Sequence, residues 1–259
     1  MRLRGRKGIR ESLENQPDLV VLDAKPHRGR WHQFFGNDRP IYIELGMGKG
    51  RFISTMSATY PDINFIGVDM YDELLRRASE KARAVWAERG VESPPNLALL
   101  RANIEWIETM FAPGEIERIY LNFSDPWPKA KHARRRLTHP RFVAKYIELL
   151  NERGEIHLKT DSKLLFEFSL NSFSDMGLQL RNISLDLHRG GVREDLVLTE
   201  YESKFIEQGQ PIHRCEVVVG REALAEHRAA MRRQVEGHKA DTPYPVSEPS
   251  SSPATTSEG

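Results

Sequence analysis

Glycines occupy every second position of the segment Gly46-Met-Gly48-Lys-Gly50, directly after a predicted strand. Positions without a side chain let the backbone pass close to a ligand and adopt positive φ angles. The next predicted strand ends in Asp69, nineteen residues beyond Gly50. A carboxylate at that distance can accept hydrogen bonds from two ribose hydroxyls, so the spacing indicates a cofactor that carries a ribose. A tight turn that binds nothing is the alternative.

Two features of this turn favour S-adenosylmethionine over a nicotinamide cofactor. The pattern lacks the third glycine of G-x-G-x-x-G, and Glu44 stands two positions before Gly46. A buried carboxylate there would repel a pyrophosphate but attract the ammonium and sulfonium groups of S-adenosylmethionine. The turn is also no P-loop, because no Ser or Thr follows its Gly-Lys pair.

Polar side chains follow two later predicted strands. Asn103 comes after the strand at 97–102, where its amide can read an adenine or cap the helix that follows. Asp125 follows the strand at 118–123, in a Ser-Asp-Pro-Trp-Pro turn that its two prolines make rigid. We expect Asp125 to lie beside the transferred group and Trp127 to offer a stacking surface. A turn or cap role for Asp125 and simple burial of Trp127 are the alternatives.

A basic segment begins directly after this turn. The whole chain carries 38 Lys and Arg against 37 Asp and Glu, a net charge of +1, so it is not a polycation as a whole. The seventeen residues from 129 to 145, however, contain no carboxylate. Their basic residues are Lys129, Lys131, His132, Arg134, Arg135, Arg136, His139, Arg141 and Lys145. Such a segment attracts phosphates, and we interpret it as a nucleic-acid contact rather than a solvated face.

The elements that must position these residues alternate between strand and helix patterns. Six runs are typical of strands and a seventh is weaker. The runs are 41–45, 64–68, 97–102, 118–123, 155–159 and 214–219, with the weaker one at 178–185. Apolar stripes with helical periodicity lie between them. This alternation predicts an α/β fold with a doubly wound, mostly parallel seven-stranded Rossmann-like sheet that binds ligands at the carboxyl ends of its strands.

Composition divides the chain into four parts. Residues 1–30 form a basic arm, 31–220 the Rossmann-like domain, 221–240 a peripheral helix and 241–259 a disordered tail rich in Pro, Ser and Thr. The first ten residues carry no acid and five bases. These are Arg2, Arg4, Arg6, Lys7 and Arg10.

The remaining composition indicates an intracellular, cytoplasmic protein. The single cysteine, Cys215, cannot form an intramolecular disulfide, and no apolar run approaches the roughly 18 residues of a membrane span. The nine histidines show no ligand spacing, so we expect no metal. No obligate protein partner is evident. Trp31, Trp86 and Trp106 sit in apolar patterns and are expected in the core.

In the string FSDPWPKAKHARRRL the chain resembles the tRNA (guanine-N7)-methyltransferases of the TrmB type, whose F-x-D-P-W-P-K precedes a stretch rich in His, Lys and Arg. The similarity extends to IELGMGKGRF, NFIGVD, the LKTD at 158–161 and the TEYESKF at 199–205, and covers roughly residues 31–220. The family more often carries Glu at the position of Asp69 and Asp at that of Asn103. Both differences keep a hydrogen-bond acceptor.

The resemblance implies a class I methyltransferase that uses S-adenosylmethionine to methylate N7 of a guanine in the variable loop of tRNA. The cofactor-binding positions are then Glu44, Asp69, Asn103 and Asp125, beside Gly46, Gly48 and Gly50. The substrate-binding positions are Lys129, Asp161, Thr199, Glu200, Tyr201 and Glu202. The RNA-contacting positions are Lys131, His132, Arg134, Arg135 and Arg136.

The implied chemistry is mainly a matter of positioning. N7 has an in-plane lone pair and no proton, so the reaction demands no general base. Asp125 would stabilise the positive charge that develops on the base, or else bind the guanine edge or the amino group of the cofactor. Asp161 would clamp the guanine or cap the next helix. Thr199 and Glu202 would accept from the Watson–Crick edge, and Tyr201 would stack or pack.

Two other functions are compatible with parts of this pattern. A non-catalytic RNA-binding protein with a relic Rossmann domain would keep the basic segment but bind no cofactor. A nicotinamide oxidoreductase would use the glycine turn but leave the basic segment unexplained.

Overall fold

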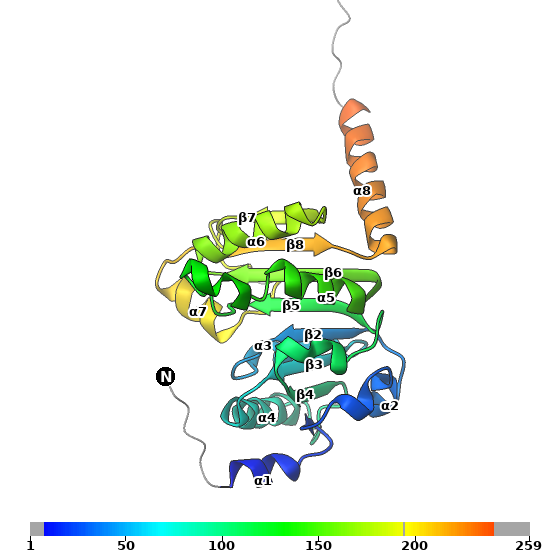
Figure 1. Ribbon diagram of the computed structural model, residues 1–259, viewed down its shortest axis with the longest axis vertical. Helices are drawn as coiled ribbons and strands as arrows, with labels where there is room; N and C mark the ends of the chain where they lie inside the picture. Colours follow the sequence, from blue (N-terminus) through cyan, green and yellow to red (C-terminus); the bar gives the residue numbers. More distant parts are fainter. Residues whose placement is uncertain (1–7, 194, 241–259) are drawn as a thin grey trace, which may run out of the picture. The chain divides into compact units, whose positions relative to one another are not determined.

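The computed structural model describes residues 8–193 and 195–240. Within them an eight-stranded sheet runs in the order β1-β4-β3-β2-β5-β6-β8-β7 (Figure 1). The strands are β1 Val20–Val21, β2 Ile41–Leu45, β3 Asn64–Asp69, β4 Leu97–Arg101, β5 Ile116–Asn122, β6 Leu150–Thr160, β7 Gln179–Ser184 and β8 His213–Val218. All pairs from β1 to β6 are parallel, and β8 runs antiparallel to both β6 and β7. The predicted class, a mostly parallel Rossmann-like sheet, is confirmed.

The sheet differs from the prediction by one strand at its edge. All seven predicted runs form strands, and the eighth strand, β1, pairs in parallel with β4 through Val20 and Val21. A run of two residues is too short to show alternation, so the sequence pattern could not predict this strand.

Helices cover both faces of the sheet. They are α1 Ile9–Glu14, η1 Lys25–His27, α2 Trp31–Phe35, α3 Arg51–Thr59, α4 Asp72–Ala87, η2 Ile104–Thr109, η3 Ala130–Arg135, α5 Pro140–Leu149, α6 Lys163–Asp175, α7 Glu200–Glu207 and α8 Arg221–Ala240. One buried cluster joins α5 and α6 to one face through Phe142 and Phe166. Another joins α3 and α4 to the opposite face through Phe52 and Leu75. Because the strands from β1 to β6 run parallel, their carboxyl ends lie at one edge of the sheet. Helix α7 lies at the same edge (Figure 1).

The expected basic arm is shorter than predicted. Leu13 of α1 and Leu19 before β1 are fully buried, and Arg10 pairs with Glu14 at 2.9 Å. Residues 9–30 therefore belong to the folded domain, because their apolar side chains extend its core. Arg2, Arg4, Arg6 and Lys7, and the predicted disordered tail at 241–259, lie outside the described residues.

The predicted helix at 221–240 is present as α8. The chain divides into two compact units, one up to Leu224 and one from Ala225. No helix within residues 8–193 and 195–240 is long and apolar enough to cross a bilayer.

Candidate active site

The glycine turn connects β2 to α3 and forms one wall of a crevice at the carboxyl edge of the sheet. The backbone has φ angles of 81° at Gly46, 56° at Gly48 and 75° at Gly50. A Cβ at Gly50 would lie 2.5 Å from Cβ of Ala78, so this glycine lets α3 pack on α4. A Cβ at Gly46 or Gly48 would meet open space. Those two positions leave the backbone accessible to a ligand.

The same crevice has walls from three other segments. We call it the carboxyl-edge crevice, and its lining residues include Glu44, Gly46, Gly48, Lys49, Phe52, Asn122, Phe123, Thr199, Glu200 and Tyr201. The residues come from β2, the glycine turn, the end of β5 and the start of α7. The structure thus brings together positions that the sequence separates by more than 150 residues.

Glu44 is buried in this wall and only half satisfied. Its Oε1 accepts a hydrogen bond from Nδ2 of Asn122 at 2.9 Å, whereas Oε2 is buried without a partner among the described residues. Burial raises the pKa of Glu44 to about 8. A buried carboxylate oxygen without a donor costs free energy, and a ligand cation would supply what it lacks. The unsatisfied carboxylate oxygen of Glu44 therefore fits a ligand that carries an ammonium group.

Asp69 at the end of β3 is held by backbone groups. The N–H of Gly48 donates to Oδ2 at 3.2 Å, and those of Met70 and Tyr71 donate to Oδ1 at 2.8 and 3.2 Å. Burial, which outweighs these hydrogen bonds, raises the pKa of Asp69, and the nearby Asp125 adds to the rise. Asp69 thus fixes the glycine turn to β3 and keeps a carboxylate lone pair available at the expected ribose position.

Asn103 lies exposed at the end of β4. Its side-chain oxygen accepts from the backbone N–H of Glu105 at 3.0 Å, which confirms the capping alternative. Its amide nitrogen is left for a ligand. The nearby Trp106 is 59% exposed, so its expected place in the core is wrong, while Trp31 and Trp86 are buried as predicted.

The Asp125 turn is fixed from behind by a buried arginine. Phe123 and Trp127 adopt φ angles of 51° and 42°, a region that costs energy for bulky residues. Arg136 donates to the carbonyl oxygens of Pro126 at 3.1 Å and Trp127 at 3.0 Å, which stabilises this backbone. Asp125 itself is exposed and forms no hydrogen bond or ion pair within the described part of the chain.

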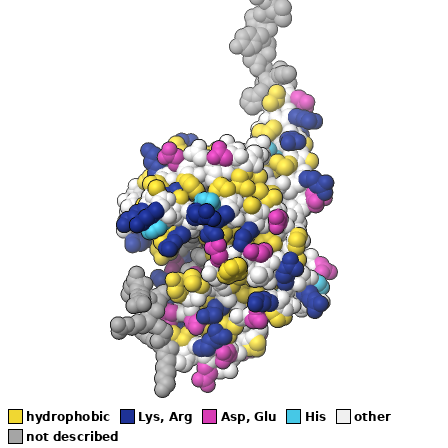
Figure 2. Space-filling model, viewed as in Figure 1, with side chains coloured by type: hydrophobic (Ala, Val, Ile, Leu, Met, Phe, Trp, Pro, Cys, Tyr) yellow, Lys and Arg dark blue, Asp and Glu magenta, His cyan; other side chains and the backbone are white. Residues whose placement is uncertain are grey.

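Arg136 therefore differs from its neighbours in the basic segment. Only 6% of its surface is exposed, so the prediction that it contacts RNA is corrected. Lys131, Arg134 and Arg135 are exposed, and Arg135 lies 4.8 Å from the ring of Trp127. Figure 2 shows Lys and Arg side chains with histidines gathered on the drawn face at the height of β5 and β6.

The end of the basic segment is partly neutralised. Arg141 pairs with Glu105 of η2, and Lys145 pairs with Glu108 at 2.8 Å. The exposed positive charge is thus concentrated in η3, next to the Asp125 turn. His132 is half-buried there, with its ring edge on Trp127.

Thr199 and Glu202 begin α7 with a capping box. The hydroxyl of Thr199 accepts from the N–H of Glu202 at 2.9 Å, and the carboxylate accepts from the N–H of Thr199 at 3.2 Å. Glu202 is fully buried, with both oxygens 3.0 Å from Nζ of Lys159 and one 2.9 Å from Nε2 of His188. This burial corrects the prediction that Glu202 contacts a guanine edge. Thr199 still lines the crevice.

The other predicted substrate positions are two exposed charged residues and Glu200, which lines the crevice. Ser162, not Asp161, caps α6 by accepting from the N–H of Leu165 at 3.2 Å, so the capping alternative for Asp161 is wrong. Asp161 and Lys129 are exposed. Glu200 pairs with Lys49 at 3.4 Å and with Lys81.

Tyr201 leaves both of its expected roles open. It is 56% exposed, yet its ring is tilted against that of Phe123 with centroids 6.3 Å apart.

Two buried residues and one half-buried residue behind these positions escaped the sequence reasoning. Asn122 holds Glu44, while Lys159 and His188 hold Glu202. Asn122 and Lys159 are polar residues in the carboxyl-terminal parts of runs predicted as strands, a signal that could have drawn attention to both. His188 lies in a loop and carries no such signal.

This combination of fold and crevice defines a Rossmann-like α/β domain with a ligand-binding crevice at the carboxyl ends of its parallel strands. A family model described as "Putative methyltransferase" matches residues 38–215. The chain is 48% identical over 219 residues to the tRNA (guanine-N(7)-)-methyltransferase of Geobacillus thermodenitrificans (strain NG80-2), covering 84% of this chain and 97% of that protein. It is 50% identical over 216 residues to the protein of that name from Streptococcus pyogenes serotype M5 (strain Manfredo), covering 83% and 99%.

A solved structure described as an antibiotic-related methyltransferase has the same fold, with a TM-score of 0.56 at 15% identity over 78% of this chain and 96% of that one. Because the family model and the two relatives at 48% and 50% identity match most of the chain, it belongs to the family of the tRNA (guanine-N7)-methyltransferases. The resemblance read from the Asp-Pro-Trp-Pro-Lys turn is confirmed.

Proposed function

We propose that this protein transfers a methyl group from S-adenosylmethionine to N7 of a guanine in the variable loop of tRNA. Family membership and the names of its relatives support the reaction. The observation that carries it is the half-satisfied carboxylate of Glu44 in the carboxyl-edge crevice. A tRNA substrate goes with a cytoplasmic location.

Each crevice residue would bind a different part of the cofactor. S-adenosylmethionine supplies an electrophilic methyl group on a sulfonium. Glu44 would bind its ammonium group, Asp69 its ribose hydroxyls and Asn103 its adenine, while the open backbone at Gly46 and Gly48 lets the cofactor approach closely. Asn122 keeps Glu44 oriented for this contact.

The guanine would be received on the opposite side, at the Asp125 turn. Asp125 is exposed and has no hydrogen bond or ion pair among the described residues, so its carboxylate can turn to a base as that base becomes cationic. Arg136 holds the turn in place, which favours a fixed geometry over a mobile one. Thr199 lines the crevice and Asp161 is exposed after β6, and the exposed cations of η3 would bind the tRNA backbone.

Neither alternative function accounts for the crevice. A relic domain without a cofactor would retain a buried, half-satisfied carboxylate at an energetic cost and for no benefit. A nicotinamide enzyme would place a pyrophosphate against Glu44. The test is incubation with labelled S-adenosylmethionine and unmodified tRNA, followed by chemical cleavage at the modified base. Label at a guanine of the variable loop supports the proposal. Binding of S-adenosylmethionine to the protein without any label in tRNA refutes it.

A further inference from the structure

A second pocket, of about 260 Å³, lies on the α3 face of the sheet. Its floor is formed by β5, β6 and β8, one side by α3, and its cover by the loop segment Asp195-Leu196-Val197. Phe52 and Asn122 line both this pocket and the carboxyl-edge crevice. The proposed methyl transfer uses none of its other residues, so the pocket needs a separate account.

The floor of the pocket presents cations. Arg118, Lys159 and Arg214 line it together with His157, whereas Asp195, the one acid in its described lining, pairs with Arg193 at 2.6 Å. The Nε of Arg118 is buried and has no acceptor among the described residues. An unused donor in a pocket wall points to an acceptor on a ligand.

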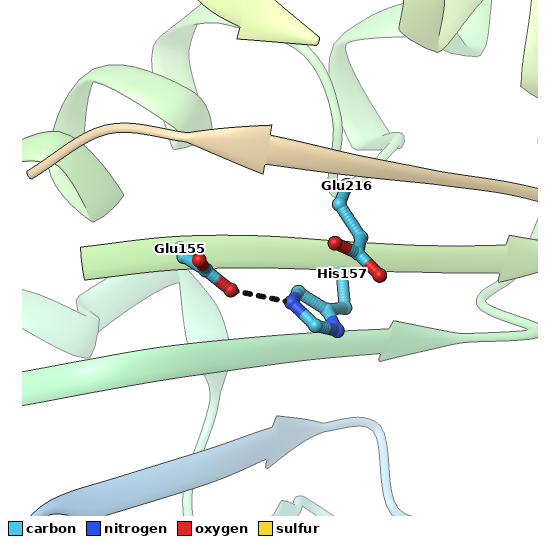
Figure 3. Close-up of side chains that lie close together, drawn as sticks. All are labelled: Glu155, His157 and Glu216. Carbon is cyan, nitrogen blue, oxygen red and sulfur yellow. Dashed lines mark hydrogen bonds and ion pairs between the residues drawn. The ribbon is translucent and has the colours of Figure 1, made fainter. Parts of the chain in front are cut away.

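The carboxylates that balance these cations lie beside the floor, on the same face of the sheet. Figure 3 shows Glu155 and His157 on β6 beside Glu216 on β8. Glu155 pairs with Arg118 at 3.1 Å and with Arg181 at 2.6 Å, and Glu216 pairs with Arg181 at 2.8 Å and with Arg214. Arginines thus use the lone pairs that a metal would need, so the cluster is a charge network rather than a cation site. Among the described residues, Arg118, Arg181, Arg214 and Lys159 thus share the carboxylates of Glu155, Glu216 and Glu202.

The remaining walls are apolar and aromatic. Phe52 and Met56 come from α3, Tyr60 follows it, and Leu196 and Val197 come from the cover. A bare inorganic anion would leave this surface unused. A ligand with both an anion and a flat apolar part would fill the pocket, and its modest volume favours a small one.

We propose that this pocket binds a pyrimidine nucleoside monophosphate, with its phosphate on Arg118 and Arg214 and its base against Phe52, Met56 and Tyr60. Arginine suits phosphate because its guanidinium donates two parallel hydrogen bonds. A pyrimidine is the smaller of the two base classes and matches the volume. The site is additional to the crevice for cofactor and guanine.

The test is calorimetric titration of the full chain, in low salt and with saturating S-adenosylhomocysteine so that the cofactor part of the crevice is filled. The probes are uridine 5′-monophosphate, uridine and inorganic phosphate. We expect the nucleotide to bind at least tenfold more tightly than either fragment. Equal affinity for phosphate and nucleotide, or no nucleotide binding at millimolar concentration, would overturn the proposal.

Two variants locate the binding. Arg118→Gln leaves Glu155 paired with Arg181 and should weaken the nucleotide at least tenfold. Val197→Trp fills the pocket from its cover without removing a charge and should abolish binding; it also decides the matter if Arg118→Gln does not fold. Arg30→Gln removes an exposed arginine elsewhere and should change nothing. Wild-type affinity in Val197→Trp would place the nucleotide outside this pocket and refute the proposal, whereas S-adenosylhomocysteine binding in each variant tests the crevice separately.

Discussion

Asn122 donates a hydrogen bond to only one oxygen of the Glu44 carboxylate, at 2.9 Å, and leaves the other oxygen buried without a donor. Burial is the largest cause of the rise in the pKa of Glu44 to about 8, and the charge of Asp69 adds to it. At neutral pH the protein without cofactor therefore holds Glu44 mostly as the neutral acid. This relationship makes cofactor binding and folding depend on pH in opposite ways.

Cofactor binding should strengthen as the pH rises from 6 to 8. The ammonium group of the ligand binds the Glu44 carboxylate, so below a pKa of about 8 binding must release a proton. The affinity then rises by up to about tenfold per pH unit. Titration of S-adenosylhomocysteine in buffers of different ionisation enthalpy measures the proton release. Glu44→Gln should bind weakly at every pH and release none, and a wild-type affinity that stays flat across this range would contradict the assignment.

The free energy of unfolding should respond to Glu44 in the other direction. The pKa rises from 4.5 in the unfolded chain to about 8 in the fold, so the fold holds the proton more tightly between these values. Stability from this group is complete below pH 4.5 and is lost as the pH rises towards 8. At about 1.4 kcal/mol per pKa unit, Glu44→Gln should stabilise the protein at pH 8 by a few kcal/mol. Urea unfolding at pH 5 and pH 8 measures it, with Asp161→Asn as the exposed control.

The strands and the turns of the site could be predicted from the sequence because local patterns determine them. Short runs of strand-forming residues predicted the seven main strands, and the glycine turn, Asp69 and Asp125 follow directly from strand ends. The partners of these residues could not be predicted. Asn122 meets Glu44 across 78 positions, and Lys159 meets Glu202 across 43, contacts that only the packed sheet creates.

Asp125→Ala should lower turnover by about 10²- to 10³-fold and leave tRNA affinity unchanged. The carboxylate is exposed and forms no hydrogen bond within the described residues, so its removal does not disturb the fold. It takes away the negative charge that stabilises the methylated, cationic guanine. Single-turnover kinetics with saturating tRNA measures this, and Asp38→Ala serves as a control at an exposed aspartate elsewhere. Unchanged turnover would remove Asp125 from the active site.

Replacing Lys131, Arg134 and Arg135 together with glutamine should weaken tRNA binding and reduce its salt dependence. Each lost phosphate contact lowers the slope of log K against log salt by about 0.7 to 0.9. These side chains are exposed in η3, so the folded state should lose little stability. Filter binding between 50 and 300 mM salt gives the slope. A slope equal to that of the wild type would show that η3 does not contact the phosphates.

Arg136→Gln should behave unlike that triple variant, although Arg136 directly follows the substituted residues. Its buried guanidinium donates to the carbonyls of Pro126 and Trp127 and lies 4.4 Å from the ring of Phe168. Its loss leaves two carbonyls of a strained turn without their donors, at a cost of about 1–3 kcal/mol each. We therefore expect a lower melting temperature and slower methylation at an unchanged salt slope, because the Asp125 turn is no longer fixed. Arg136→Lys keeps the charge but cannot donate to both carbonyls in the same way, so it should restore little of the stability or of the methylation rate. A reduced salt slope with normal stability would instead return Arg136 to the RNA-contacting set.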